Sequence, residues 1–239
     1  MHTLSAMNYS SHAQAASRSR GQGLVSDALW ATYRWMAVGL GVTGLVAMLV
    51  ASSPAALELV VGNRIVFYGL FFAQLGLVFA FNGVARRAST PVVAGMFLAY
   101  AALTGLTSSV IFLIYTMRSI GAVFFVTAGA FAGLSVVGLV TKRDLSAVGR
   151  FATFALIGII LATVISMFVP SAGLQLGIAI IGVLVFAALT AYDTQKLKEL
   201  FASGEVHANM PLVGALVLYL DFINMFFFML RIFGGRRSS

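Results

Sequence analysis

The stretch LVLYLDFINMFFFMLRIFG, residues 216–234, is long enough to cross a bilayer as a helix, yet it carries an aspartate, Asp221. The preceding apolar stretch ends in ALTAYDTQKLK, residues 188–198, and holds Asp193. An acidic side chain at the centre of a bilayer costs about 3 kcal/mol even on the mildest scales, so it seldom persists without a function. Since the chain has only seven acidic residues among 239, these two are its most informative feature.

The composition places the whole chain in a membrane. Hydrophobic residues make up 60% of it and charged residues 9%, and the mean hydropathy is +0.99. A soluble protein of this size has too little interior to bury that much apolar surface, so lipid must be the solvent. The absence of cysteine excludes disulfides, thiolate catalysis and cysteine-based metal sites.

Seven apolar stretches predict an all-α integral membrane protein with seven transmembrane helices. Short links between them predict three consecutive hairpins, with the last helix left unpaired. We expect residues 1–26 to form a disordered polar tail, 27–235 the transmembrane domain and 236–239 a basic tail. The predicted helices are 29–51, 64–84, 91–115, 119–140, 151–169, 174–200 and 211–233.

The distribution of lysine and arginine predicts the orientation. If the N-terminus is cytoplasmic, the outer loops hold only Arg64 and Arg118. Seven crossings then leave Arg236 and Arg237 outside, against this bias, and a re-entrant last segment is the alternative. We favour seven crossings because 211–233 is long enough to span. The cytoplasmic segments hold nine basic residues: Arg18, Arg20, Arg86, Arg87, Lys142, Arg143, Arg150, Lys196 and Lys198.

The net charge of +8 does not indicate nucleic acid, because the basic residues lie in short loops between apolar runs. That pattern is typical of membrane topology and of contact with anionic lipid. Small residues four apart, at Gly129–Gly133 and Gly173–Gly177, predict places where helices approach closely.

The two aspartates lie on consecutive antiparallel helices joined by a short loop, so their carboxyl groups can approach one another if the last helix tilts or bends. Two adjacent carboxylates do not both ionise cheaply, and such a pair shares a proton and acts as a pH switch. Once deprotonated, the pair is a hard oxygen site that suits a passing calcium ion. Asn224, one turn after Asp221, is a supporting polar group. The alternative is purely structural: each aspartate pairs with Arg86 or Arg87 at the inner end of the second helix.

Two other classes of function stay open at this stage. An intramembrane aspartyl protease also needs two carboxylates sharing a proton, but LYLD stands where those enzymes have GxGD, and the chain has no PAL string. A non-transporting regulator of another membrane protein, such as a protease, is the third reading. All three histidines lie in the tail or a loop (His2, His12 and His207), so no histidine-based site is expected within the membrane. We expect neither enzymatic activity nor a resident cofactor.

The two aspartate-bearing strings, LTAYDTQKLK and LYLDFINMFFFMLRIFG, resemble the paired C-terminal signature of the Bax inhibitor-1 family in its bacterial branch. AQLGLVFAFNG at 73–83 and TAGAFAGLSVVGLVTKRDLS at 127–146 are similar to that branch as well. The likeness runs from about residue 25 to the end.

The resemblance implies seven helices in which the last is central and enclosed by three hairpins. It also implies a pH-sensitive calcium leak of the bacterial inner membrane, with Asp193 and Asp221 as its gate and an arginine, Arg86 or Arg87, in the closed state. Family members are further credited with suppressing cell death and with binding a membrane protease. No residue of this chain speaks to either role.

Overall fold

The computed structural model describes residues 2–169, 171–204 and 207–237, and for residues 2–20 and 22 it describes the backbone alone. Six of the seven predicted crossings are single helices of 22 residues or more. The third crossing is a helix interrupted after Ser108. This confirms the all-α membrane fold. The long helices are α1 (His2–Ala51), α3 (Arg64–Ala85), α4 (Thr90–Ser108), α6 (Met117–Val140), α7 (Ser146–Phe168), α8 (Ala172–Ala202) and α9 (Met210–Phe233).

Short helical turns complete the connections. The chain passes from α1 to α3 through α2 (Pro54–Leu57) and the π-helical turn η1 (Glu58–Gly62). The third crossing is finished by α5 (Ile111–Ile114), which follows α4. The apolar part of α1 begins at Gly23, and the boundary of the predicted tail at residue 26 stays a prediction.

Polar caps and prolines mark where the helices begin. Asn63 Oδ1 accepts hydrogen bonds from the backbone N–H groups of Ile65 and Val66 at 3.0 and 3.3 Å, and Thr116 Oγ1 accepts one from Ser119 at 3.3 Å. These contacts satisfy donors that the first turn leaves without an intrahelical partner. Pro211 lies in the first turn of α9, where the missing N–H costs nothing.

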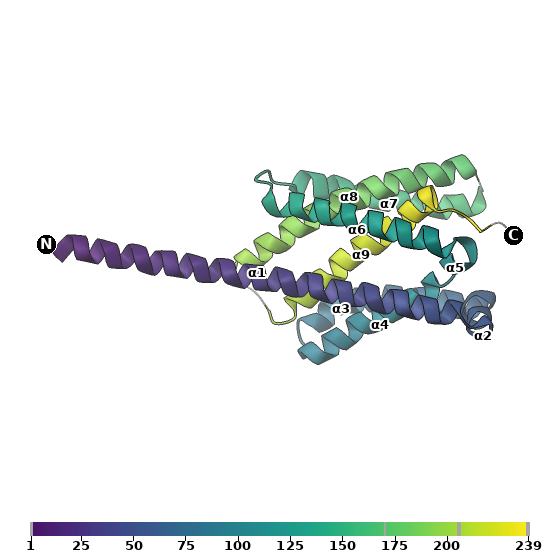
Figure 1. The fold of residues 1–239 in the computed structure, drawn as a ribbon, viewed down its shortest axis with the longest axis horizontal. Helices are drawn as coiled ribbons and strands as arrows, with labels where there is room; N and C mark the ends of the chain where they lie inside the picture. Colours follow the sequence, from purple (N-terminus) through teal and green to yellow (C-terminus); the bar gives the residue numbers. More distant parts are fainter. Residues whose placement is uncertain (1, 170, 205–206, 238–239) are drawn as a thin grey trace.

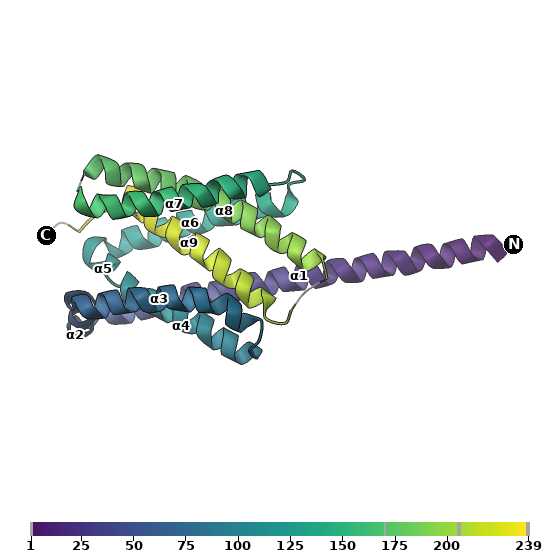
Figure 2. The same ribbon diagram turned by 180° about the vertical axis from the view of Figure 1, so that it is seen from behind.

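The last helix occupies the centre of the bundle (Figures 1 and 2). Within the apolar window of α9, 61% of the residues are buried in protein, against 6% for α3 and 11% for α7. Its main neighbours are α8, α1 and α6, with α3 and α4 touching it at one end. The expectation that the last helix is central is therefore confirmed.

The C-terminal residues show that α9 crosses the whole bundle. Beyond α9, Gly235 O accepts a hydrogen bond from Thr116 N at 3.1 Å, and Arg237 N donates to Ile114 O at 3.0 Å. We call this contact of residues 234–237 with residues 112–119 the C-terminal clasp. It lies at the end of the bundle opposite the N-terminus (Figure 1). The geometry is that of a spanning helix and not of a re-entrant segment.

The surrounding helices pair differently from three simple hairpins. Of the expected pairs only α7 and α8 pack extensively; α1 packs on α4, and α6 on α8. Two glycines permit these approaches. A Cβ on Gly105 would lie 2.7 Å from Thr43 O of α1, and one on Gly138 would collide with Ala191 O of α8. Backbones come this close only where one helix lacks a side chain.

The small-residue pairs singled out from the sequence are not the packing sites. A Cβ on Gly129, Gly133 or Gly177 would have no neighbour within 4 Å, and one on Gly173 would meet only Ser171 Oγ at 3.9 Å. The prediction of close helix approach there was wrong, because these glycines face away from the neighbouring helices.

The two kinds of glycine on α6 give a matched test of this packing. We expect Gly138→Leu to lower the stability of the protein by about 1–3 kcal/mol, because the side chain meets the backbone of α8, which cannot move aside. Gly133→Leu, on the same helix but in open space, should be neutral or slightly stabilising. Thermal unfolding in detergent measures both, and equal melting temperatures would contradict the packing described here.

Candidate functional site

The structure brings Asp193 and Asp221 together. Asp193 lies in the last third of α8 and Asp221 midway along α9, and these antiparallel helices share an extensive interface. The two carboxyl groups lie next to one another across this interface. Asp221 is only 4% exposed, whereas Asp193 is half-buried. One member of the pair is therefore sealed in the bundle, and the other lies nearer the end at which α8 terminates.

The surroundings of Asp221 favour a proton in this contact. Its Oδ2 atom is buried without a hydrogen-bond donor from any other group that the structure describes. An ionised carboxylate only accepts hydrogen bonds, so two carboxyl groups bond to one another only when one is protonated. The geometry fits an acid and a carboxylate sharing one proton, and two adjacent negative charges would repel.

A second network fixes the rotation of α9 and so the direction in which Asp221 points. Thr43 Oγ1 of α1 donates to Ala101 O of α4 at 2.9 Å and lies 2.6 Å from the Tyr219 hydroxyl. Because the single Thr43 proton is used on Ala101, Tyr219 is the donor to Thr43. The Tyr219 ring also packs edge-on against Phe97 and Tyr100, with ring centroids 5.8 and 5.9 Å away. The network joins three helices at a residue two positions before Asp221.

Polar residues of α8 hold Asp193 in a similar way. Thr194 Oγ1 lies 3.4 Å from the Tyr33 hydroxyl of α1. Gln195 reaches the connection between α6 and α7: its Nε2 donates to Arg143 O and its Oε1 accepts from Leu145 N, both at 2.9 Å. The segment that carries Asp193 is thus tied to a neighbouring helix and to a loop.

These supporting residues escaped the sequence analysis. Tyr219, Thr43 and Gln195 each carry a polar group inside or beside an apolar run, which was the available signal. Their partners are 50 to 176 residues away in the chain, so only the fold reveals what they contact.

Neither candidate arginine contacts the pair. Arg86 and Arg87 are exposed at the end of α3, and neither contributes to the surroundings of Asp193 or Asp221. The purely structural alternative, in which each aspartate is neutralised by one of these arginines, is therefore not what the structure shows. Asn209 nevertheless ties this end of α3 to the start of α9, since its Nδ2 donates to Ala85 O at 3.0 Å and to Ala88 O at 2.9 Å.

Asn224 is half-buried, and its Nδ2 donates to Leu220 O of its own helix at 2.8 Å. It contributes to the floor of a groove of about 610 Å³ between α3 and α7. A supporting role toward Asp221 stays a prediction.

The site has few ligands for a resident metal ion. Among the described residues, no three histidine, cysteine or acidic side chains gather in one place. Calcium in proteins usually takes six to eight oxygen ligands. Two carboxyl groups supply only part of such a ligand set.

Comparison with known proteins identifies the family of this chain. The sequence profile of the family described as "Inhibitor of apoptosis-promoting Bax1" matches residues 25–238. Inner membrane protein YbhL of Escherichia coli K12 is 47% identical over 210 residues, covering 86% of this chain and 90% of YbhL. An uncharacterised protein of Deinococcus radiodurans is 46% identical over 208 residues, covering 86% of this chain and 89% of its own. One from Borreliella burgdorferi is 40% identical over 208 residues, covering 85% and 90%. The chain belongs to the Bax inhibitor-1 family of membrane proteins.

Proposed function

We propose that this protein is a pH-sensitive, calcium-permeable leak channel, gated by the carboxyl pair of Asp193 and Asp221. The observation that carries the proposal is the buried contact between these two carboxyl groups, one on each of two antiparallel helices. Such a contact holds α8 and α9 together as long as one proton is shared. It also supplies negative charge, the chemistry that a cation pathway needs, once that proton leaves.

The sign of the pH effect follows from this chemistry. At low pH the shared proton keeps the contact intact and limits the charge of the pair to at most one. At higher pH the proton is lost, and the two negative charges repel one another and attract a divalent cation. The flux of calcium should therefore rise with pH.

The arginines at the end of α3 complete the proposed mechanism. Arg86 and Arg87 are cations on a helix end that Asn209 holds against the start of α9. A small movement of this end would bring a guanidinium toward the deprotonated carboxylates, where it would compete with calcium and favour the closed state.

Calcium uptake into proteoliposomes, followed with an enclosed indicator across mildly acidic to mildly basic pH, tests the gate. We expect Asp221→Asn and Asp193→Asn each to lower the flux at the higher pH by about tenfold or more, because a focused negative site concentrates its counterion by at least that factor. Both variants should also flatten the pH profile.

Asp144→Asn is the matched control, since Asp144 is exposed in the loop between α6 and α7. Hydrogen bonds from the Ser146 side chain and backbone hold the pKa of the Asp144 carboxyl below its usual range, so it does not titrate near neutral pH. This variant should keep the native profile. Unchanged flux and an unchanged pH profile in both members of the pair would overturn the proposal.

The arginine step makes a separate prediction. Replacing Arg86 and Arg87 together by glutamine should raise the calcium flux by up to about fivefold, the range expected for loss of a solvent-exposed ion pair. Arg150→Gln removes a cation that is exposed on α7 and should have no effect. If the double variant matches the native protein, the gate consists of the carboxyl pair without an arginine.

We further propose that the protein lies in the bacterial inner membrane with its N-terminus in the cytoplasm. The Escherichia coli relative is named an inner membrane protein, and the excess of lysine and arginine at one end of the bundle supports the orientation.

Because the chain has no cysteine, single cysteines report this orientation without a background signal. Ala55 in α2 and Ala202 at the end of α8 are both exposed, and replacing either by cysteine does not alter a charge. A membrane-impermeant maleimide applied to intact spheroplasts should label Ala55→Cys at once and Ala202→Cys only after permeabilisation. The reverse pattern would place the N-terminus outside.

A further inference from the structure

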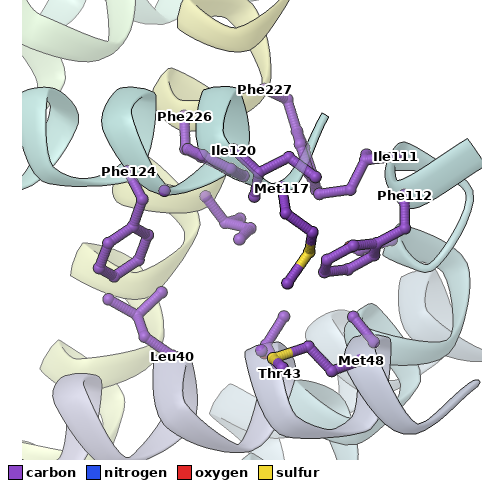
Figure 3. A pocket seen from close by; sticks show the side chains of 15 residues that line it. Leu40, Thr43, Met48, Ile111, Phe112, Met117, Ile120, Phe124, Phe226 and Phe227 are labelled. Atoms are coloured by element: carbon purple, nitrogen blue, oxygen red, sulfur yellow. The ribbon is translucent and has the colours of Figure 1, made fainter. Parts of the chain in front are cut away.

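An apolar cavity of about 230 Å³ lies away from the carboxyl pair, in the half of the bundle that holds the C-terminal clasp. Figure 3 shows Thr43 and Met48 of α1 on one side, Met117 and Ile120 of α6 opposite, and Phe112 of α5 at one end. Phe226 and Phe227 of α9 line the cavity on the same side as Ile120. Thr43 and Ser108 are the polar side chains on the wall, and Thr43 already bonds to Tyr219 and Ala101.

The cavity opens sideways, toward lipid. α1 and α6 lie on either side of α9 and do not pack extensively against one another. The lining residues at this gap, Gly44, Met48 and Met117, are exposed, the two methionines by 50% and 53%. At the depth of a membrane helix, such an opening faces acyl chains rather than water.

The cavity continues into a more polar one at the end of the bundle. This second cavity measures about 260 Å³ and shares Met48, Phe112 and Met117 with the first. Its additional lining includes Ser52 and Arg237. The apolar cavity thus leads to the guanidinium group of Arg237.

Arg237 is held in place by the clasp. Its backbone N–H donates to Ile114 O at 3.0 Å, and its Nη1 donates to Phe112 O at 2.9 Å. A guanidinium has five N–H donors in a fixed fork that matches phosphate, so one bond to a carbonyl leaves most of them for a ligand. The side chain is exposed, as a headgroup contact requires.

We propose that these two connected cavities form a binding site for one anionic phospholipid, with its phosphate on Arg237 and an acyl chain between α1 and α6. The positive charge at the polar end selects an anionic headgroup. The apolar part is smaller than the roughly 300–1,000 Å³ of drug-sized pockets, so it suits a single chain. Flexible Met48 and Met117 at the mouth adapt to such a chain.

The test uses the full-length protein in nanodiscs of phosphatidylcholine with a minor fraction of phosphatidylglycerol. In separate samples the phosphatidylglycerol or the phosphatidylcholine carries a photoactivatable acyl chain, and peptide mass spectrometry locates the cross-links. We expect phosphatidylglycerol cross-links on α1, α5 and α6 around the cavity, well above those of phosphatidylcholine at equal concentration.

Two glycine variants distinguish cross-links from lipid in the cavity from cross-links made by the surrounding bilayer. Gly121 lines the cavity and has room for a side chain. Gly129 has room as well, but it lies on the lipid-facing surface of the same helix, outside the cavity. Gly121→Leu should reduce the cavity cross-links by about tenfold or more, since a few methylene groups in an apolar pocket have effects of that size. Gly129→Leu should leave them unchanged. Gly44→Leu, on the opposite wall, serves as the second filling variant if Gly121→Leu does not fold.

The headgroup half has its own pair of variants. Arg237→Gln should reduce the preference for phosphatidylglycerol by about fivefold, the contribution of one basic side chain near an anionic lipid, while the clasp keeps its backbone bonds. Arg118→Gln, an exposed arginine that does not line either cavity, should leave the preference intact. Equal labelling by both lipids, or cross-links that survive in both filling variants, would overturn the proposal.

Discussion

Enclosure of α9 by the other helices is the constraint on which the rest of the structure depends. This helix carries a carboxyl group and a phenol at the depth of the hydrocarbon, where either would be costly in contact with lipid. Each finds a partner on a neighbouring helix: Asp221 meets Asp193 of α8, and Tyr219 donates to Thr43 of α1. In lipid, apolar surface gives little drive for helices to associate, so packing and hydrogen bonds of this kind decide which helices meet.

The enclosure also separates two environments within one bundle. The carboxyl pair lies between α8 and α9, and Gln195 and Asn209 tie these two helices to neighbouring segments. The cavity in the opposite half has a mostly apolar wall, with Thr43 and Ser108 as its polar residues, and it adjoins a second cavity lined by Arg237 of the C-terminal clasp. The carboxyl pair and the apolar cavity are separate parts of the bundle, and the α9 side chains of Tyr219 and Phe222 are buried in its interior.

The crossings and the aspartate pair were predictable from sequence, because both depend on local hydropathy and on the order of helices along the chain. Which helices pack together was not. Gly138 and Gly133 lie in the same apolar run, and only the facing backbone of α8 distinguishes a packing glycine from an exposed one. The same holds for Asn209. Its side chain bonds to the end of α3 over a separation of more than 120 residues, so the residues next to it in the sequence do not reveal this contact. Orientation and the role of the arginines stay predictions, since hydropathy and charge counts do not report them directly.

The position of α9 has a consequence for how the protein is made. Synthesis and insertion proceed from the N-terminus, so the helices that surround the centre enter the membrane before the helix that fills it. Until α9 arrives, Thr43 and Asp193 lack the groups that they contact in the finished bundle. The early helices therefore form an incompletely packed assembly, and the insertion of α9 completes the packing of the bundle. A bundle of this design completes its tertiary structure only at the end of translation, and an interrupted chain would leave polar groups facing lipid, a feature that quality-control machinery in the membrane can recognise.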